Sequence, residues 1–305
     1  MPKACRRRSD FDIEKKRYLI MDIDSRFPTK LNTIHDAPKP FRSVLIDNIS
    51  SQESVHLLVH APLFSTDYQR LPATVLAVTD KGWLVASETE DGTASVKKAA
   101  FNDTLLLELA SILLSSYFQI HFARVGTSYS ASMTFDTVEE GLYRDAVDLI
   151  LQGIDPTSSS AAENDHDDAM LFASWPIRFR AEAERYRPKD QRLLAAIQWP
   201  AIFSGFHREI CPAGALLVTK RELVLISEEK TSPRRHTGDI YKFGGIITYF
   251  PIVRLEDIHV SHQERFGILA LRVHSRHGAE KLEILMPTDY EQAVSTAMEQ
   301  VVSSI

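Results

Sequence analysis

A short basic cluster in the second half of the sequence is the best candidate for binding chemistry. It consists of Arg234, Arg235 and His236, and Arg208 lies in an earlier loop of the same half. Such side chains hold phosphate groups through charge-assisted hydrogen bonds. The cluster therefore predicts a site for an anionic lipid or a small phosphorylated ligand. The alternative is a solvated loop tip whose charge is offset by nearby acids such as Asp239.

An aromatic segment with two adjacent glycines follows the basic cluster, and it is the candidate for contact with another protein. Missing side chains in a strand allow a second backbone to approach closely. We expect a contact edge that contains Tyr241, Phe243, Gly244, Gly245, Tyr249 and Phe250. The alternative is a bulged strand whose aromatic side chains fill the core.

The spacing of histidines, serines and glycines does not indicate metal binding or catalysis. His259 and His262, like His274 and His277, are three positions apart, and in a strand this spacing places them on opposite faces. The sequence has no Gly-x-Ser-x-Gly elbow, no phosphate-binding glycine loop and no His-Glu-x-x-His motif. We therefore expect no metal, no cofactor and no catalytic residue, and the protein is not expected to be an enzyme.

Composition and charge are those of a folded protein in a reducing compartment. The 305 residues are 44% hydrophobic and 25% charged, and the net charge of −6 repels nucleic acid. Cys5 and Cys211 are too isolated for a disulfide framework. The basic residues Arg6, Arg7 and Arg8 are followed by acids instead of the apolar core of a signal peptide, and no stretch approaches the ~18 apolar residues of a membrane span. These features predict a cytoplasmic protein without a nucleic-acid partner or a transmembrane segment.

The elements that would position the candidate residues come in two copies. Pro72–Thr79 matches Pro212–Thr219 at an offset of 140 residues, and the match continues to Ser87–Glu88 over Ser227–Glu228. In each copy two short apolar runs flank a turn, which predicts a β-hairpin. Internal similarity of this kind indicates a duplicated structural unit.

Two further blocks extend the match toward the end of each copy. Leu107–Glu108 lies over Leu255–Glu256 at an offset of 148, and Asp136–Glu139 lies over Thr288–Glu291 at an offset of 152. The last blocks begin with N-cap residues at capping-box spacing, and apolar residues follow at helical period. Each copy is therefore expected to be a run of strands that ends in an amphipathic helix.

Four segments are expected along the chain. Residues 1–42 form a polar N-terminal arm, residues 43–154 the first domain, residues 155–169 a Ser- and Asp-rich linker, and residues 170–305 the second domain. The linker contains no apolar run, which is typical of a spacer between domains. The second domain is expected to begin with a helix around Arg178–Tyr186.

The second copy carries motifs of a known fold family. Gly214–Ile226, followed by Val253–Ile258, resembles the pleckstrin-homology-like (PH-like) superfamily, nearest its GRAM and bacterial PH-like branch. The resemblance covers most of residues 193–303 and, more faintly, residues 52–151. It implies an α+β, mainly β fold with two PH-like domains, each a small antiparallel β-sheet or barrel capped by a C-terminal helix.

The resemblance also bears on function. The family's best-known activity, phosphoinositide binding, uses basic residues in the loop between the first two strands. The corresponding loops, Ser65–Arg70 and Ser204–Glu209, each contain one arginine. We therefore expect a non-catalytic interaction or scaffold protein that recognises a protein partner or associates with itself. Binding of an anionic lipid or a small phosphorylated ligand by the basic loop of the second domain is the alternative.

Overall fold

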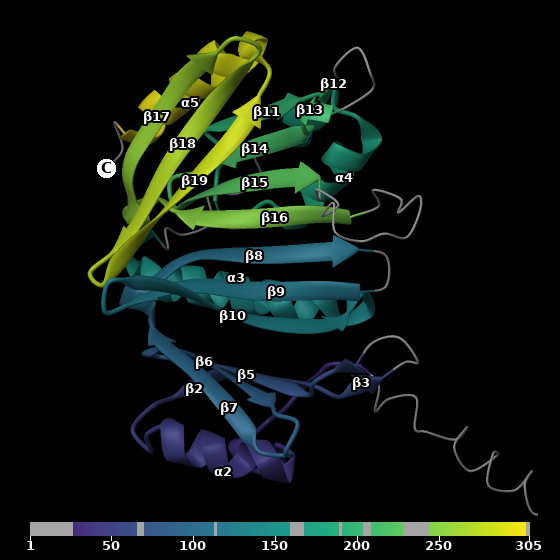
Figure 1. Cartoon of the computed structure of the whole chain (residues 1–305), viewed down its shortest axis with the longest axis vertical. Helices are drawn as coiled ribbons and strands as arrows, with labels where there is room; N and C mark the ends of the chain where they lie inside the picture. The colour runs from purple at the N-terminus through teal and green to yellow at the C-terminus, as the bar shows by residue number, and fades with distance from the viewer. Residues whose placement is uncertain are drawn as a thin grey trace, which may run out of the picture.

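Antiparallel strands make up most of the described chain, and they form three main sheets arranged along the long axis of the molecule (Figure 1). The structure is a computed structural model that describes residues 27–65, 70–112, 115–158, 168–188, 191–203, 209–228 and 244–302. None of the helices in these ranges has the length and apolarity that crossing a bilayer requires.

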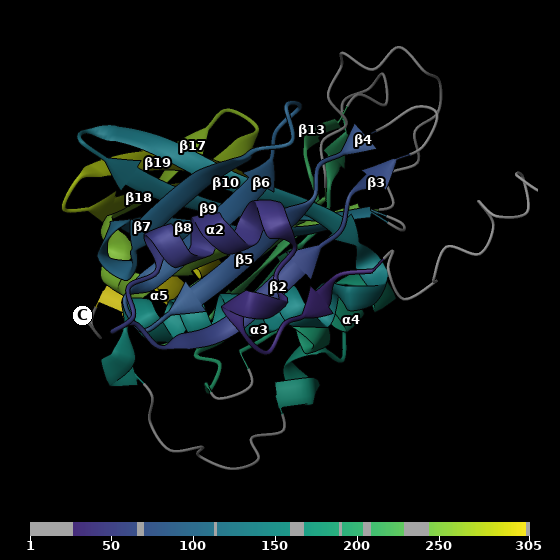
Figure 2. The same cartoon turned by 90° about the horizontal axis from the view of Figure 1, so that it is seen from below.

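The five-stranded sheet comes from the first half of the chain, and helix α2 lies across its outer face (Figure 2). In spatial order its strands are β1 (Thr29–Lys30), β2 (Val55–Ala61), β5 (Thr74–Thr79), β6 (Gly82–Glu88) and β7 (Ala94–Ala100). Successive residues of a strand face opposite sides. Val75 and Ala77 therefore belong to the cluster under α2 (Lys39–Asn48), whereas Leu76 and Val78 belong to the central core.

A seven-stranded sheet forms the middle layer and contains strands from both halves of the chain. In spatial order these are β10 (Thr127–Asp136), β9 (Ser115–Arg124), β8 (Thr104–Ile112), β16 (Gly244–Pro251), β15 (Glu222–Glu228), β14 (Gly214–Val218) and β11 (Ala195–Trp199). The halves meet where β16 pairs with β8 in antiparallel orientation. Helices α3 (Glu140–Ile154) and α4 (Ile177–Tyr186) cover one face of this sheet.

The third layer is a three-stranded sheet at the C-terminal end. It consists of β17 (Leu255–Gln263), β18 (Phe266–Ser275) and β19 (Gly278–Met286). Helix α5 (Glu291–Val302) packs with these strands and with β14 and β15 around a second core. Two short strand pairs lie outside the main sheets, and they are β3 (Phe64–Ser65) with β4 (Arg70–Leu71) and β12 (Ile202–Phe203) with β13 (Glu209–Cys211).

The two halves repeat one order of elements, which we call the first and second repeat. Each has a helix, four antiparallel strands in one sheet, three in another, and a final helix. The first repeat uses α2, then β2, β5, β6 and β7, then β8 to β10, then α3; the second uses α4, then β11, β14, β15 and β16, then β17 to β19, then α5. The predicted hairpins and final helices are confirmed, as is a mainly antiparallel β fold that ends in a helix.

The strand pairing corrects the predicted alignment of the two repeats. β6 and β15 keep the offset of 140 residues, but from β7 and β16 onward the offset is 151. A bulge between Thr104 and Leu106 of β8 recurs between Leu255 and Asp257 of β17, which fixes this register. The blocks at offsets of 148 and 152 are therefore misaligned. An isolated Leu-Glu match does not show which face of a strand each residue occupies.

One of the two predicted helix caps is present. Asp136 accepts a hydrogen bond from the backbone N–H of Val138 at 3.0 Å. In the second repeat the N-cap of the turn before α5 is Pro287, so the prediction of Thr288 as the cap is wrong. The predicted offset of 152 residues paired Thr288 with the cap residue Asp136. At the offset of 151 residues Thr288 corresponds instead to Thr137.

Each repeat begins with a helix that the predicted domain boundaries divide. α2 and α4 lie 138 residues apart, both follow a proline, and each buries a phenylalanine, Phe41 or Phe179. α2 therefore spans the predicted boundary between residues 42 and 43, and part of the predicted polar arm belongs to the first repeat. Its apolar face buries only Phe41 and Leu45, which is too short a pattern to stand out among charged neighbours.

Candidate functional site

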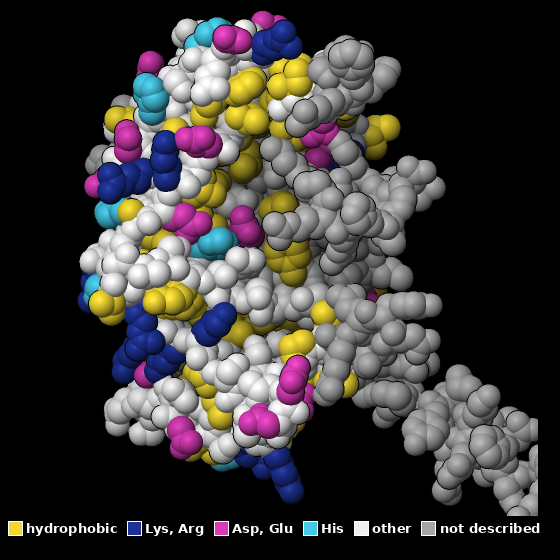
Figure 3. All heavy atoms as spheres, in the orientation of Figure 1, with side chains coloured by type: hydrophobic (Ala, Val, Ile, Leu, Met, Phe, Trp, Pro, Cys, Tyr) yellow, Lys and Arg dark blue, Asp and Glu magenta, His cyan; other side chains and the backbone are white. Residues whose placement is uncertain are grey.

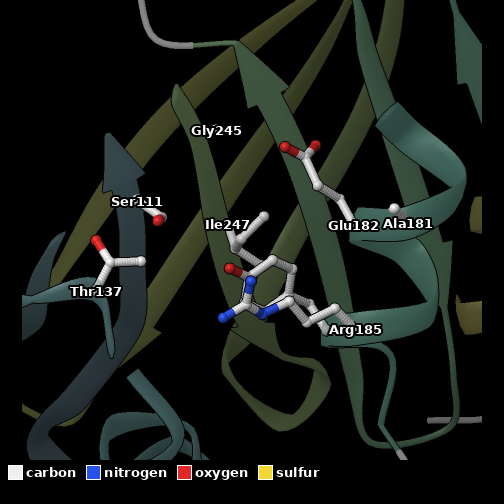
Figure 4. A pocket seen from close by; sticks show the side chains of 8 residues that line it. Ser111, Thr137, Ala181, Glu182, Arg185, Gly245 and Ile247 are labelled. Atoms are coloured by element: carbon white, nitrogen blue, oxygen red, sulfur yellow. The ribbon is translucent and has the colours of Figure 1, made fainter. Parts of the chain in front are cut away.

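A polar pocket lies at the seam between the two repeats, where the paired strands β8 and β16 end (Figure 4). Gly245 and Ile247 line it from β16, Ser111 lines it from β8, and Thr137 lies just before α3. Helix α4 forms the opposite wall. The pocket has a volume of about 330 Å³, at the lower end of the range for small-molecule sites.

Glu182 of α4 supplies a carboxylate to this seam pocket. Its Oε1 accepts a hydrogen bond from Arg178 Nε at 3.2 Å, and Arg178 Nη1 also donates to Glu228 at 2.9 Å. The Oε2 atom is buried and has no hydrogen-bond partner among the described residues. Burial raises the pKa of Glu182, Arg178 opposes this rise, and Glu228 adds to it. The carboxylate therefore has the capacity to accept another donor.

Arg185 lies one turn further along the same face of α4. Its Nη2 is 3.2 Å from Oε2 of Glu140, a carboxylate that is fully buried at the start of α3. Arg144 is 3.9 Å from the other oxygen of Glu140. Burial, together with the charge of Glu140, raises the pKa of Tyr186 well above its ordinary value, so its hydroxyl is neutral. This end of the pocket thus presents a guanidinium group beside a neutral phenol.

Gly245 makes room for the carboxylate of Glu182. A Cβ atom at position 245 would lie 2.9 Å from Glu182 Oε1, closer than packed atoms approach. From the sequence, the Gly244–Gly245 pair is expected to admit the backbone of a partner. In the structure, Gly245 instead admits a side chain of its own chain.

The predicted contact edge around β16 is wrong, because β16 is not an edge strand. It pairs with β15 on one side and with β8 on the other. Tyr249 and Phe250 are 4% and 0% exposed and belong to two different cores on opposite faces of the sheet. A strand covered on both faces is apolar throughout, so the aromatic side chains fill the core. Tyr241 and Phe243 lie outside the described residues.

The predicted anion site lies outside the described residues. This applies to Arg208 and to the cluster of Arg234, Arg235 and His236. Over the face shown in Figure 3, the described acidic and basic side chains are interspersed. Binding of an anionic ligand by the basic cluster therefore stays a prediction.

Two of the four histidines considered for metal binding contact carboxylates in the described structure. His262 lies 2.9 Å from Glu291, and His277 lies 2.8 Å from Asp103. In the described ranges, no three His, Cys, Asp or Glu side chains are placed to hold a metal ion.

A second feature with functional potential is the outer edge of β11. The equivalent edge in the first repeat is occupied, because β1 pairs with β2 in antiparallel orientation and Leu31 N donates to Leu58 O at 2.8 Å. At the corresponding place in the second repeat, Asp168 and Ala169 lie in the 3-10 helix η6 (Asp168–Phe172). β11 is the last strand of its sheet in the part of the chain that the structure describes. No described strand therefore pairs with the outer backbone groups of β11.

The sequence did not indicate the seam pocket or the outer edge of β11. Gly245, which lines the pocket, was the one pocket residue among the predicted contact residues. Glu182 and Arg185 are three residues apart, which places them on one face of a helix. Charged pairs at this spacing are common on exposed helices, and nothing in the sequence indicates that β8 and β16 lie beside α4. The pairing of β16 with β8 is the missing information.

Comparisons with known proteins do not identify a family. No protein-family model matches the chain, and no curated protein has a similar sequence. Membership of the PH-like superfamily therefore stays a prediction from Gly214–Ile226 and Val253–Ile258.

Proposed function

We propose that this chain is a non-catalytic interaction protein built from two PH-like units, and that it recognises a protein partner by strand addition at the outer edge of β11. Two observations support the PH-like assignment. Each repeat consists of antiparallel strands followed by a final helix, as the sequence resemblance implies. The second repeat contains both motifs that carry the resemblance, one in the β14–β15 hairpin and the other at the start of β17.

The observation that carries the proposal is the difference between the equivalent edges of β2 and β11. β2 has an added strand, β1, on its outer side, even though α3 also contacts β2. β11 has the same place in the second repeat and contacts α5, and no described strand pairs with its outer side. The first repeat therefore shows that this edge of the fold accepts an extended segment.

The first repeat also indicates which backbone groups would pair. Leu31 bonds to Leu58, and residues two apart in a strand direct their backbone groups to the same edge. In β11, the residues that correspond to Leu58 and to the residue two positions after it are Ala196 and Gln198, 138 positions later. Their backbone groups therefore face the outer edge. Strand addition uses main-chain hydrogen bonds for affinity and alternate side chains for specificity.

The packing of β1 suggests the kind of segment that β11 selects. Leu31 packs against the cluster under α2. In a segment paired with β11, the side chain equivalent to Leu31 would face α4. Ala196 packs against the central core at this place. The partner is therefore an extended peptide segment with an apolar residue facing α4.

A proline substitution at the edge tests this function. Gln198→Pro removes an outward N–H group, and edge strands tolerate proline. Gln198→Thr keeps the N–H group and is the matched control. Tagged wild-type protein and both variants are used to co-purify partners, which are compared by quantitative mass spectrometry.

Wild type and Gln198→Thr are expected to retain the same partner, and Gln198→Pro is expected to reduce its recovery at least tenfold, as the loss of one or two hydrogen bonds allows. Circular dichroism checks that the proline variant is folded. Equal recovery with a folded Gln198→Pro protein would exclude the β11 edge. A defined turnover by the purified protein would refute the non-catalytic assignment.

A further inference from the structure

The seam pocket has groups of opposite charge at its two ends, and the proposed partner binding does not use it. It opens beside β16, which is three strands away from β11 in the seven-stranded sheet. Figure 4 shows Glu182 and Arg185 projecting from α4 into the same space, with Ser111 and Thr137 across from them.

The Glu182 end has an excess of negative charge. Among the described residues Arg178 contacts both Glu182 and Glu228, so two carboxylates share its guanidinium group. The buried Oε2 of Glu182 has no donor among the described residues. A buried carboxylate oxygen without a donor is unfavourable, and a cationic donor would recover this cost.

The Arg185 end has the opposite balance. Here two guanidinium groups, those of Arg144 and Arg185, share the single buried carboxylate of Glu140. Arg185 is about half exposed, and its contact with Glu140 uses only one of its nitrogens. A guanidinium group has five N–H donors, so Arg185 can also bind the carboxylate of a molecule in the pocket.

Helical geometry places the two ends near each other. Residues three apart on a helix have Cβ atoms roughly 5–6 Å from each other. One small molecule with an ammonium and a carboxylate group can therefore reach both Glu182 and Arg185. The pocket volume of about 330 Å³ also admits a molecule of this size. The Ser111 hydroxyl offers a further hydrogen bond from β8.

We infer that the seam pocket binds a small zwitterion of the amino-acid class. The ammonium group donates to Glu182 Oε2, and the carboxylate accepts from Arg185. Because β8 belongs to the first repeat while β16 and α4 belong to the second, the bound molecule contacts both repeats. It therefore stabilises their association as well as filling the pocket.

Binding to the full chain is tested with four probes of three carbons each, by isothermal titration calorimetry and by the shift in melting temperature. L-Alanine and β-alanine are the zwitterions, propylamine lacks the carboxylate, and propionate lacks the ammonium group. At least one zwitterion is expected to bind tenfold or more tightly than propylamine and propionate. Equal binding of propylamine would overturn the zwitterion assignment, and so would the absence of binding by both zwitterions at 50 mM.

Two variants assign the binding to this pocket. Glu182→Gln keeps the side-chain shape and is expected to weaken zwitterion binding at least tenfold. Glu184→Gln, an exposed position on α4, is the matched control and is expected to leave binding unchanged. If Glu182→Gln unfolds, Ala181→Leu replaces it, because Ala181 is exposed and lines the pocket. Unchanged binding in a folded Glu182→Gln or Ala181→Leu protein would overturn the proposal.

Discussion

One histidine joins the seven-stranded sheet to the C-terminal sheet through ionic contacts. His121 of β9 lies between two carboxylates, with Nδ1 3.3 Å from Glu280 of β19 and Nε2 3.5 Å from Glu108 of β8. Ser128 of β10 also donates to Glu280 at 2.8 Å. Burial alone would lower the pKa of His121, but Glu108 and Glu280 outweigh burial and raise it to about 9. His121 is therefore protonated at neutral pH and joins the two sheets as a cation.

The size and sign of the effect on stability follow from this pKa. A rise from 6.5 to about 9 corresponds to ~3 kcal/mol in favour of the folded state when His121 is charged. The Nε2 distance to Glu108 exceeds that of a good hydrogen bond, and the side chain is 15% exposed, so about 2 kcal/mol is a better expectation. Because the folded-state pKa is the higher one, this stability is complete below the unfolded pKa and is lost as the pH rises through the folded pKa.

Urea unfolding of wild type and His121→Gln at pH values from about 6 to 10 measures this contribution. The free energy of unfolding of wild type is expected to fall by about 2 kcal/mol more than that of His121→Gln across this range, because titration of the other groups cancels in the difference. His35→Gln, at an exposed position of the first repeat, is the control and should follow wild type. Parallel pH profiles for wild type and His121→Gln would refute the assignment of the ionic contact.

Three single substitutions and one double variant test packing and buried polar contacts by urea unfolding. Phe41→Ala is expected to destabilise the protein by about 3–5 kcal/mol, because the buried Phe41 packs α2 onto the first repeat. An effect below about 1 kcal/mol would contradict the assignment of α2 to the fold. Arg221→Ala leaves the buried Glu222 without the guanidinium group that lies 2.5 Å away, which should lower stability by about 3–5 kcal/mol, whereas Arg221→Met combined with Glu222→Leu should recover most of the loss. Thr104→Val removes the acceptor for Trp83 Nε1 at 2.8 Å and should lower stability by about 1–3 kcal/mol. A neutral result for either polar change would mean that the partner finds another contact.

The local elements of each repeat could be predicted because their signals are local. The hairpins follow from apolar alternation on both sides of a short turn, and Thr79 and Thr219 occupy equivalent places before those turns. The final helices follow from apolar residues at helical period, such as Val294, Met298 and Val301. Duplication made these patterns clearer, since each was seen twice.

The arrangement of the repeats could not be predicted because it depends on contacts distant in sequence. A largely apolar strand such as β16 has the same sequence pattern whether it is a barrel strand or the join between two units. The seam pocket depends on this join, and so does the contact of Gly245 with Glu182. The misaligned offset had another cause, because the eleven extra residues of the second repeat lie between β15 and β16, where few residues match.

The pairing of β16 with β8 also makes the two ends of the molecule different from each other. This pairing joins unlike edges, because β16 is the fourth strand of the second repeat and β8 is the fifth strand of the first. It is therefore a head-to-tail contact, which does not close on itself as a twofold contact does. The counterparts of these edges are β7 and β17, the last strands of their sheets in the described structure. β7 carries the exposed Lys97 and Lys98, whereas β17 carries the exposed Glu256 and Asp257. The two outer strands therefore carry side chains of opposite charge, and charged side chains on an edge strand disfavour its pairing with a like edge of another copy.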